Sequence, residues 1–235
     1  MGYRKDPFSP GEVYHLTVRG VEQRQIFQDD TDRRRLRLLL PFCGLPEQRV
    51  NLSAVLRHAR RRGENVRMPR LLPGRRLLAL LCYCFMPNHL HFLVREEVAR
   101  GISRYMQRLL NSYARYFNVR YERSGPLFAG PFHSVHVEDD EQLLHVSRYI
   151  HLNPYVAGLV DDPLAYPWSS LGEYIGSPVV QPVCDTELIH SLLSPPAYRR
   201  FVLSYAASAR GRAAREKELA HRVQARIRRQ TSKRF

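Results

Sequence analysis

Two histidines, His89 and His91, are the first residues of this 235-residue sequence whose types and spacing suggest chemistry. They lie in the stretch CYCFMPNHLHFLV, residues 82–94, whose other residues are mostly those of a buried β-strand. Because side chains alternate along a strand, both imidazoles are expected on one face, where they can bind a single metal ion. Two other interpretations stay open: a core hairpin with structural histidines, and a zinc site that adds Cys82 and Cys84. Structural zinc sites usually have paired ligands in knuckle-like spacings, whereas these cysteines lie within an apolar run.

A second group of polar residues follows further along the chain. Its members share three- and four-residue spacing, which makes one stripe on a helix: Gln142, His145, Tyr149 and Asn153. Tyr149 and Asn153 are then neighbours one turn apart. Pro154 disfavours helical backbone at Asn153, so this pairing requires the helix to persist through its last turn. A packed amphipathic aromatic is the alternative interpretation of Tyr149.

Strands and helices must bring these residues together, and the pattern of apolar and polar residues predicts their order. The predicted elements are a strand at 13–20, a helix at 29–44, a β-hairpin at 77–94 that turns at residues 86–88, a helix at 102–121, a short strand after the Gly/Pro loop that begins at residue 124, and a helix at 139–153. This order is typical of an α+β fold, an antiparallel sheet with helices packed on it.

The charge of the chain predicts its class of partner. Lys and Arg number 37 against 22 Asp and Glu, a formal net charge of +15, and hydrophobic residues make up 44% of a chain that can therefore fold. This balance favours a polyanionic partner, either nucleic acid or an anionic membrane surface. On the helix at 102–121, the face opposite the apolar one carries three candidate DNA-binding residues, Arg104, Arg108 and Arg115.

Segments that would direct the chain into or across a membrane are not expected. The longest apolar run, RRLLALLCYCFM, is shorter than the roughly 20 residues that a membrane span requires, and the N-terminal MGYRKDPFSP lacks a signal-peptide hydrophobic region. The four cysteines form no C-x-x-C pair and resemble reduced core thiols. These features predict a soluble protein of a reducing, cytosolic compartment.

The chain is expected to divide after residue 174. Residues 1–174 contain the predicted sheet and helices, together with an arginine-rich excursion at 45–76 that is expected to be exposed. Residues 175–235 form a predicted basic helical C-terminal extension, whose last part is a solvated helix or an arm that holds phosphates loosely.

Two motifs carry a resemblance to a known family. MPNHLHFLV, followed later by SRYIHLNPYVAGLVDDPLAYPWSS, resembles the single-tyrosine HUH transposases of insertion sequences, and specifically the REP-associated tyrosine transposases. The resemblance covers about residues 13–174. It implies a ferredoxin-like or RRM-like HUH nuclease fold, and a bacterial cytoplasmic protein associated with the nucleoid. Its implied partner is single-stranded or hairpin DNA, with no membrane. A homodimer is one candidate assembly.

The resemblance also implies roles for particular residues. Carried over to this sequence, it makes Tyr149 the nucleophile that attacks a DNA phosphate, and His89, His91 and Asn153 the ligands of a divalent metal ion, Mg²⁺ or Mn²⁺. Arg148 is a nearby cation that can assist the phenol and contact DNA. His151 lies on another face of the helix and receives no role.

The predicted activity is a metal-dependent single-stranded DNA endonuclease and strand transferase that forms a 5′-phosphotyrosine intermediate. A catalytically inactive nucleic-acid-binding protein of the same fold is the alternative. A two-histidine phosphoesterase would need two H-x-Thr/Ser motifs, which HLHF and HSVH do not provide. The loop LFAGPFHS differs from the Gln and Gly-Arg-aromatic-Lys run of many relatives, so its phosphate contacts are not carried over.

Overall fold

The computed structural model describes residues 8–47, 52–63, 76–179 and 181–212. Its centre is a four-stranded antiparallel sheet with strand order β2-β3-β1-β4. The strands are β1 (Val13–Arg19), β2 (Leu78–Met86), β3 (His89–Glu96) and β4 (His133–Val137). The α+β fold predicted from the sequence is therefore confirmed.

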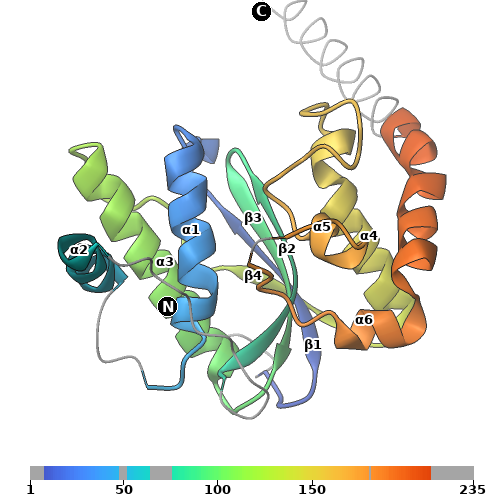
Figure 1. The fold of residues 1–235 in the computed structure, drawn as a ribbon, viewed down its shortest axis with the longest axis horizontal. Helices are drawn as coiled ribbons and strands as arrows, with labels where there is room; N and C mark the ends of the chain where they lie inside the picture. Colours follow the sequence, from blue (N-terminus) through green and yellow to red (C-terminus); the bar gives the residue numbers. More distant parts are fainter. Residues whose placement is uncertain (1–7, 48–51, 64–75, 180, 213–235) are drawn as a thin grey trace, which may run out of the picture.

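Helices cover both faces of the sheet (Figure 1). One face carries α1 (Asp30–Cys43) and α3 (Gly101–Arg120), with α2 (Leu52–Arg62) outside them. The other face carries α4 (Asp140–Val156), α5 (Leu171–Tyr174), α6 (Glu187–Leu192) and helical residues 195–212. A 3-10 turn, η1 (Val21–Gln23), follows β1. None of the helices within these described ranges is both long and apolar enough to cross a membrane.

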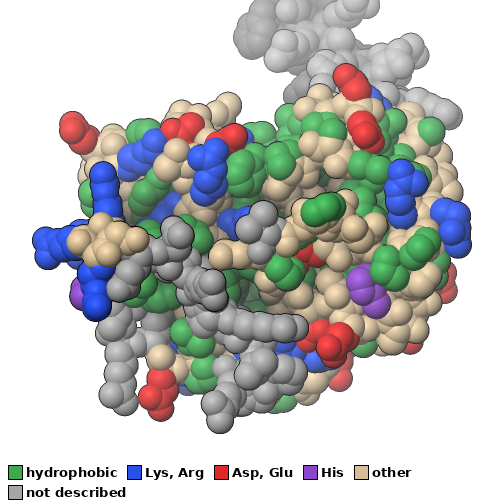
Figure 2. Space-filling model, viewed as in Figure 1, with side chains coloured by type: hydrophobic (Ala, Val, Ile, Leu, Met, Phe, Trp, Pro, Cys, Tyr) green, Lys and Arg blue, Asp and Glu red, His purple; other side chains and the backbone are tan. Residues whose placement is uncertain are grey.

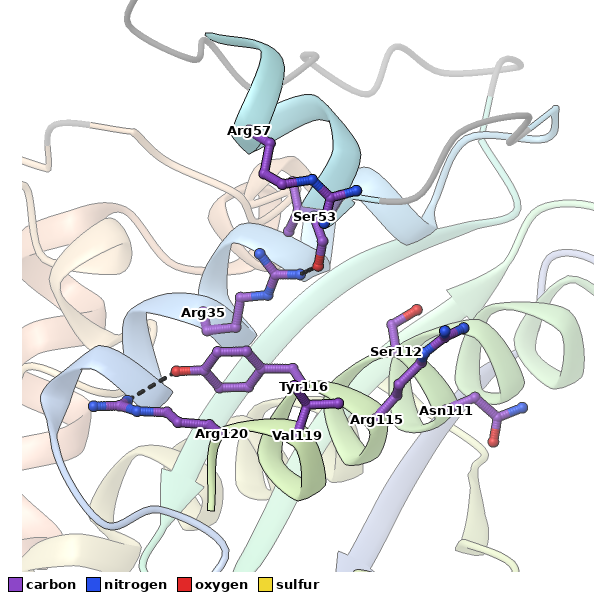
Figure 3. A pocket seen from close by; sticks show the side chains of 10 residues that line it. Arg35, Ser53, Arg57, Asn111, Ser112, Arg115, Tyr116, Val119 and Arg120 are labelled. Carbon is purple, nitrogen blue, oxygen red and sulfur yellow. Dashed lines mark hydrogen bonds between the residues drawn. The ribbon is translucent and has the colours of Figure 1, made fainter. Parts of the chain in front are cut away.

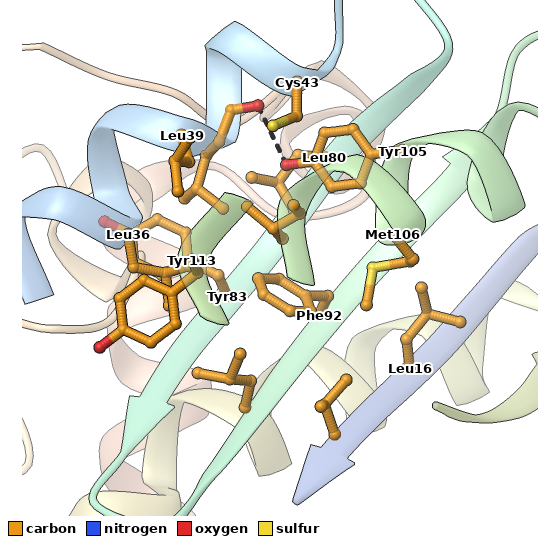
Figure 4. Packing of buried hydrophobic residues seen from close by; sticks show 14 of the residues in the cluster. Leu16, Leu36, Leu39, Cys43, Leu80, Tyr83, Phe92, Tyr105, Met106 and Tyr113 are labelled. Carbon is orange, nitrogen blue, oxygen red and sulfur yellow. Dashed lines mark hydrogen bonds between the residues drawn. The ribbon is translucent and has the colours of Figure 1, made fainter. Parts of the chain in front are cut away.

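Alternation along the two central strands divides their side chains between two cores. Leu16 of β1 and Phe92 of β3 pack with Tyr105 and Met106 of α3 in the first core (Figure 4). The neighbours of these strand residues, such as His91, must then face α4. The same backbone that builds the first core thus presents the histidines on the opposite face.

The second core joins the sheet to α4. Cys82 and Cys84 of β2 pack with Leu143 and Ile150 of α4 and with Tyr198 of the helical residues 195–212. α4 is capped at its N-terminus by Asp139, whose side chain accepts a hydrogen bond from the Gln142 backbone N–H. It continues through Pro154 to Val156, so the helical turn needed to pair Tyr149 with Asn153 is present.

The β-hairpin turns as predicted. β2 ends at Met86 and β3 begins at His89, with Pro87 and Asn88 between them. The turn is anchored on a neighbouring loop because the Ile26 backbone N–H donates to the Pro87 carbonyl at 2.9 Å.

The prediction of an exposed excursion at 45–76 is wrong for part of that segment. Leu52 of α2 is buried in the first core. Arg76 is also buried, and its guanidinium forms ion pairs with Asp185 and Glu97. These acidic residues are distant in the sequence, so local charge counts did not reveal that Arg76 has partners. Residues 48–51 and 64–75 lie outside the described residues.

The predicted C-terminal extension contributes to the second core as far as the structure describes it. Ile189, Tyr198 and Val202 are fully buried there. The division of the chain after residue 174 stays a prediction, and the most basic part of the extension, 213–235, lies outside the described residues.

Candidate active site

The two histidines of the HLH motif lie on the face of the sheet that α4 covers. Their ring centroids are 4.9 Å apart and the ring planes are inclined by 78°. The prediction that His89 and His91 share a face is confirmed. His91 is only 4% exposed, and its Nε2 atom has no hydrogen-bond partner among the described residues.

A third histidine, His15 of β1, lies against them and was missed in the sequence. Its Nε2 atom is 3.0 Å from Nδ1 of His91, and the two rings are nearly parallel with centroids 5.3 Å apart. The pairing of β1 with β3 explains this contact, because Thr17 lies opposite His91 and His15 lies two residues along on the same face. Its alternation with apolar residues in VYHLTVRG could have indicated that His15 lies on the face of the strand opposite the core residues. Which strands pair with β1 was not predicted, so the contact with His91 was not foreseen.

Burial keeps the three imidazoles neutral near neutral pH. It is the largest cause that lowers the pKa of His91 to about 3, with smaller effects from the nearby His15, His89 and Arg19. Burial, with a smaller effect from Arg19, lowers the pKa of His89 to about 4. Burial and the neighbouring His133 lower the pKa of His15 to about 4. Neutral imidazoles retain the lone pairs that metal ligands require.

Asn88 fixes the orientation of His89. The Asn88 side-chain nitrogen donates to the Gln23 carbonyl at 3.2 Å, which leaves the amide oxygen 2.7 Å from Nδ1 of His89. An amide oxygen only accepts, so Nδ1 of His89 carries the hydrogen and Nε2 carries the lone pair. This is the protonation pattern that a histidine needs to bind a metal through Nε2.

Tyr149 of α4 reaches the same place. Its ring centroid is 5.7 Å from that of His91 and 6.0 Å from that of His15, both in edge-to-face arrangements. Tyr149 is 54% exposed, so it is accessible from solvent. The structure therefore brings the tyrosine of the second motif to the histidines of the first.

Asn153 lies one turn after Tyr149, as its spacing predicts. Its side-chain nitrogen donates to the Tyr149 carbonyl oxygen at 3.0 Å. The amide oxygen stays available as an acceptor or ligand, since that bond uses only the nitrogen.

The side chains around His91 offer a suitable nitrogen ligand for a divalent metal ion, but few further ligands of the usual kinds. The buried Nε2 of His91 has no partner, and a cation is a suitable one for a buried lone pair. No cluster of three or more His, Cys, Asp or Glu in the described parts of the chain is arranged to hold a metal ion. A site here must therefore combine imidazoles with another kind of ligand, such as an amide oxygen.

The cysteines of the same stretch do not resemble zinc ligands. Cys82 and Cys84 are fully buried in the second core, and neither forms a disulfide. Burial raises the pKa of both thiols far above the usual range, which disfavours the thiolate that zinc requires.

His151, which received no role from the sequence, links three elements in the second core. Its Nδ1 atom is 2.8 Å from the Tyr198 hydroxyl and its Nε2 atom is 2.8 Å from the Ser170 hydroxyl. The Tyr198 hydroxyl donates onward to Ser147, so its oxygen accepts from His151. His151 thus ties α4 to helical residues 195–212, and its role is structural.

A pocket of about 430 Å³ opens beside Tyr149, between α4 and helical residues 195–212. Asn153, Arg148 and Arg212 are among the residues that line it. The Arg148 guanidinium lies between aromatic rings, 4.1 Å from the ring centroid of Phe201 and 3.9 Å from that of Tyr205. Arg148 thus lines the same pocket as Tyr149, and its orientation is held by Phe201 and Tyr205.

The other predicted DNA-binding arginines lie across the sheet, on α3. Arg104 donates to the Pro46 carbonyl at 3.1 Å, and Arg108 donates to the Leu45 carbonyl at 2.6 Å. Both guanidinium groups thus hold the chain that follows α1. The structure does not bring Arg104, Arg108 or Arg115 to Tyr149.

Arg115 lines a larger pocket, of about 600 Å³, bounded by α1, α2 and α3 (Figure 3). Arg35, Arg57 and Arg120 line it as well. Arg35 donates to the Ser53 hydroxyl at 2.6 Å, and Arg120 is paired with Asp29 and Asp32. In Figure 2, blue Lys and Arg side chains gather over α2, beside this pocket. This side of the molecule is a second basic region, distinct from the one at Tyr149.

The family comparison agrees with the resemblance stated from the sequence. Residues 74–153 match the family described as "Transposase IS200 like", a segment that contains the HLH motif, Tyr149 and Asn153. Among solved structures, the chain is similar to one described as "Structure of the REP associates tyrosine transposase bound to a REP hairpin". That likeness has 15% sequence identity and a TM-score of 0.49, and covers 79% of this chain and 93% of that chain. No curated protein sequence matches the chain.

Proposed function

We propose that this chain, which matches IS200-like transposases over residues 74–153, is a metal-dependent single-stranded DNA endonuclease and strand transferase with Tyr149 as its nucleophile. The observation that carries the proposal is the approach of the Tyr149 ring to within 5.7 Å of the His91 ring. These residues come from different layers of the fold, α4 and β3, so sequence proximity does not explain their meeting.

The chemistry is a transesterification at a DNA phosphate. The Tyr149 oxygen forms a bond to phosphorus, the bond from phosphorus to the 3′-oxygen breaks, and the phenolic proton is lost while the 3′-oxygen gains one. The products are a 5′-phosphotyrosine link and a free 3′-hydroxyl. Because the new ester replaces the old one, a second strand can later displace Tyr149 and rejoin the DNA.

A divalent cation, Mg²⁺ or Mn²⁺, supplies charge stabilisation at the phosphate when it is bound. His89 and His91 would hold it through their Nε2 atoms, and Asn153 would add an amide oxygen. Imidazole ligands favour Mn²⁺ over Mg²⁺, because Mg²⁺ prefers oxygen.

The arginines divide the proposed DNA contacts between two regions. Arg148 lies beside Tyr149 and is suited to the phosphate under attack. Arg115 belongs to the basic pocket on the other face, where it could bind a phosphate of the same DNA away from the cut. DNA contacts by Arg104 and Arg108 stay predictions, since both guanidinium groups already bind backbone carbonyls.

Single-stranded or hairpin DNA is the proposed partner, and the bacterial cytoplasm at the nucleoid is the proposed location. The net charge of +15 supports a polyanionic partner. The homodimer stays a prediction.

The test is a covalent adduct with defined polarity. Purified protein is incubated with Mn²⁺ and hairpin oligonucleotides labelled at either the 5′ or the 3′ end, then separated on a denaturing gel. Attack by Tyr149 retains the 3′-labelled fragment on the protein and releases the 5′-labelled one. Tyr149→Phe should form no adduct and still bind DNA, whereas Tyr155→Phe, a matched change on the same helix, should form it normally. If the wild-type protein binds these hairpins and forms no adduct, the inactive nucleic-acid-binding protein is the better account.

A further inference from the structure

We propose that His15 is a positioning residue for His91: it accepts a hydrogen bond from Nδ1 of His91 and so keeps Nε2 of His91 as the unprotonated, metal-binding atom. This inference rests on the proposed function, in which His91 is a metal ligand. Neither the sequence motifs nor the family match, which begins at residue 74, assigns any role to His15.

The contact between the two rings is close and well shielded. Nε2 of His15 lies 3.0 Å from Nδ1 of His91, within the range of an N–H···N hydrogen bond. The two ring planes are inclined by only 14°, which suits a hydrogen bond in the plane of both rings. The His91 side chain is 4% exposed, so water does not compete effectively for its Nδ1 atom.

Counting hydrogens leaves two arrangements for two neutral rings. Either Nδ1 of His91 donates to His15, and Nε2 of His91 carries a lone pair, or His15 donates and Nε2 of His91 carries the hydrogen. Nε2 of His91 is buried without a partner among the described residues. A buried N–H without an acceptor stays unsatisfied, whereas a buried lone pair can be satisfied by a cation. The first arrangement is therefore the one that a metal site selects.

The other ligand is held in the same way by a different group. The Asn88 oxygen lies 2.7 Å from Nδ1 of His89 and fixes its hydrogen there. Each histidine of the HLH motif thus has its Nδ1 atom bound and its Nε2 atom left for a ligand. Asn88 comes from the hairpin turn and His15 from β1, so separate elements orient the two rings.

The contacts of His15 favour positioning over direct ligation. Its Nε2 atom meets a ring nitrogen of His91, and the described residues contain no arrangement of three histidines that could hold a metal ion. His15 also lies edge-to-face with Tyr149, at a centroid separation of 6.0 Å. One ring therefore contacts both the proposed ligand and the proposed nucleophile.

The experiment reads the tautomer of His91 directly in the metal-free protein. Long-range ¹H–¹⁵N correlation spectra of histidine-labelled protein distinguish protonated from unprotonated ring nitrogens. In the wild type, Nδ1 of His91 should carry the hydrogen. His15→Phe keeps a ring of similar size without an acceptor, and should shift the hydrogen of His91 towards Nε2. His15→Gln offers an amide oxygen in place of the imidazole nitrogen and should restore the wild-type tautomer.

Metal affinity is the second readout, measured by Mn²⁺ titration calorimetry without DNA. Loss of a group that orients a ligand commonly weakens metal binding by about 10- to 100-fold, which is the loss expected for His15→Phe. His15→Gln should bind Mn²⁺ nearly as tightly as the wild type. His136→Phe, which removes a histidine from β4 that contacts Glu12 and Tyr14, is the matched control and should change neither readout.

Three results would overturn the inference. The first is a wild-type His91 protonated at Nε2, and the second is a His15→Phe protein with unchanged tautomer and Mn²⁺ affinity. The third is an equal loss of Mn²⁺ affinity in His15→Phe and His15→Gln with the tautomer intact, because His15 would then be a ligand itself. If the wild type binds no Mn²⁺ and forms no DNA adduct, the proposed function fails, and the tautomer of His91 still decides whether His15 orients it.

Discussion

The stability of the fold should depend on pH through His151, and the size of this effect follows from its surroundings. Burial lowers the pKa of His151 from 6.5 to about 3 in the folded protein. As the pH falls, the unfolded chain therefore binds a proton at this residue before the folded chain does. The stability associated with the neutral ring is present above pH 6.5 and is lost progressively as the pH falls towards 3.

The linkage relation gives the magnitude. Between about pH 7.5 and about pH 4.5, this pKa difference removes about 3 kcal/mol from the free energy of unfolding. The total loss approaches about 5 kcal/mol once the pH lies well below the lower of the two pKa values. His151→Gln also disturbs the hydrogen bonds to Tyr198 and Ser170, but it does so at every pH. The contribution of His151 protonation is therefore measured by the change in the free energy of unfolding with pH, and not by its value at one pH.

Urea unfolding at the two pH values, with chelator present to exclude metal binding, measures this difference. The wild-type free energy of unfolding should fall by about 3 kcal/mol more than that of His151→Gln over the same interval. The other buried histidines also lose stability as the pH falls, and their contribution cancels in the comparison. His58→Gln removes an exposed histidine of α2 and should follow the wild type. Equal losses in the wild type and His151→Gln would refute the reasoning.

The remaining predictions concern the core, the metal site and the DNA contacts. Phe92→Ala should lower the free energy of unfolding by about 3 to 5 kcal/mol in chemical denaturation, because its ring is fully buried in the first core. Cys82→Ser with Cys84→Ser should leave Mn²⁺ affinity in calorimetry within about twofold, since thiolates are not the proposed ligands; released stoichiometric zinc would instead support a structural zinc site. Arg115→Ala should weaken hairpin binding in a fluorescence titration and leave cleavage of the bound strand unchanged, and slower cleavage at saturation would contradict a contact remote from the cut. Removal of residues 213–235 should flatten the salt dependence of single-strand binding by about 0.7 in slope per lost phosphate contact, to a similar degree for hairpin and scrambled strands.

The sequence predicted those parts of the site that depend on local periodicity. Alternation placed His89 and His91 on one face, and helical spacing placed Tyr149 and Asn153 one turn apart. Both predictions needed only the geometry of a single strand or helix. The meeting of the two motifs came from the family resemblance, because no local pattern specifies how α4 lies on the sheet.

The parts that the sequence did not predict depend on contacts between distant segments. His15 reaches His91 only because β1 lies between β3 and β4 in the sheet. Arg76 is buried because Asp185 lies beside it in the folded chain. Arg104 donates to the Pro46 carbonyl, a contact that the sequence did not reveal, and its contact with DNA stays a prediction. In each case the contacting residue is far away in the sequence. Local patterns of charge and hydrophobicity do not indicate which distant segments meet in the folded chain.

The layer of side chains between α4 and β2 acts as a spacer that sets the gap between the proposed nucleophile and the proposed ligands. Tyr149 stands on α4, and His91 stands on β3 directly opposite Cys84 of β2. A larger side chain at Cys84 would therefore press on His91 itself, whereas one at Cys82, which packs in the same layer and lies opposite Leu93, would lift α4 without that contact. Such a change would alter the distance between Tyr149 and His91 and would leave both side chains as they are. Such variants should keep the Mn²⁺ affinity of the wild type and change the rate of the proposed DNA cleavage.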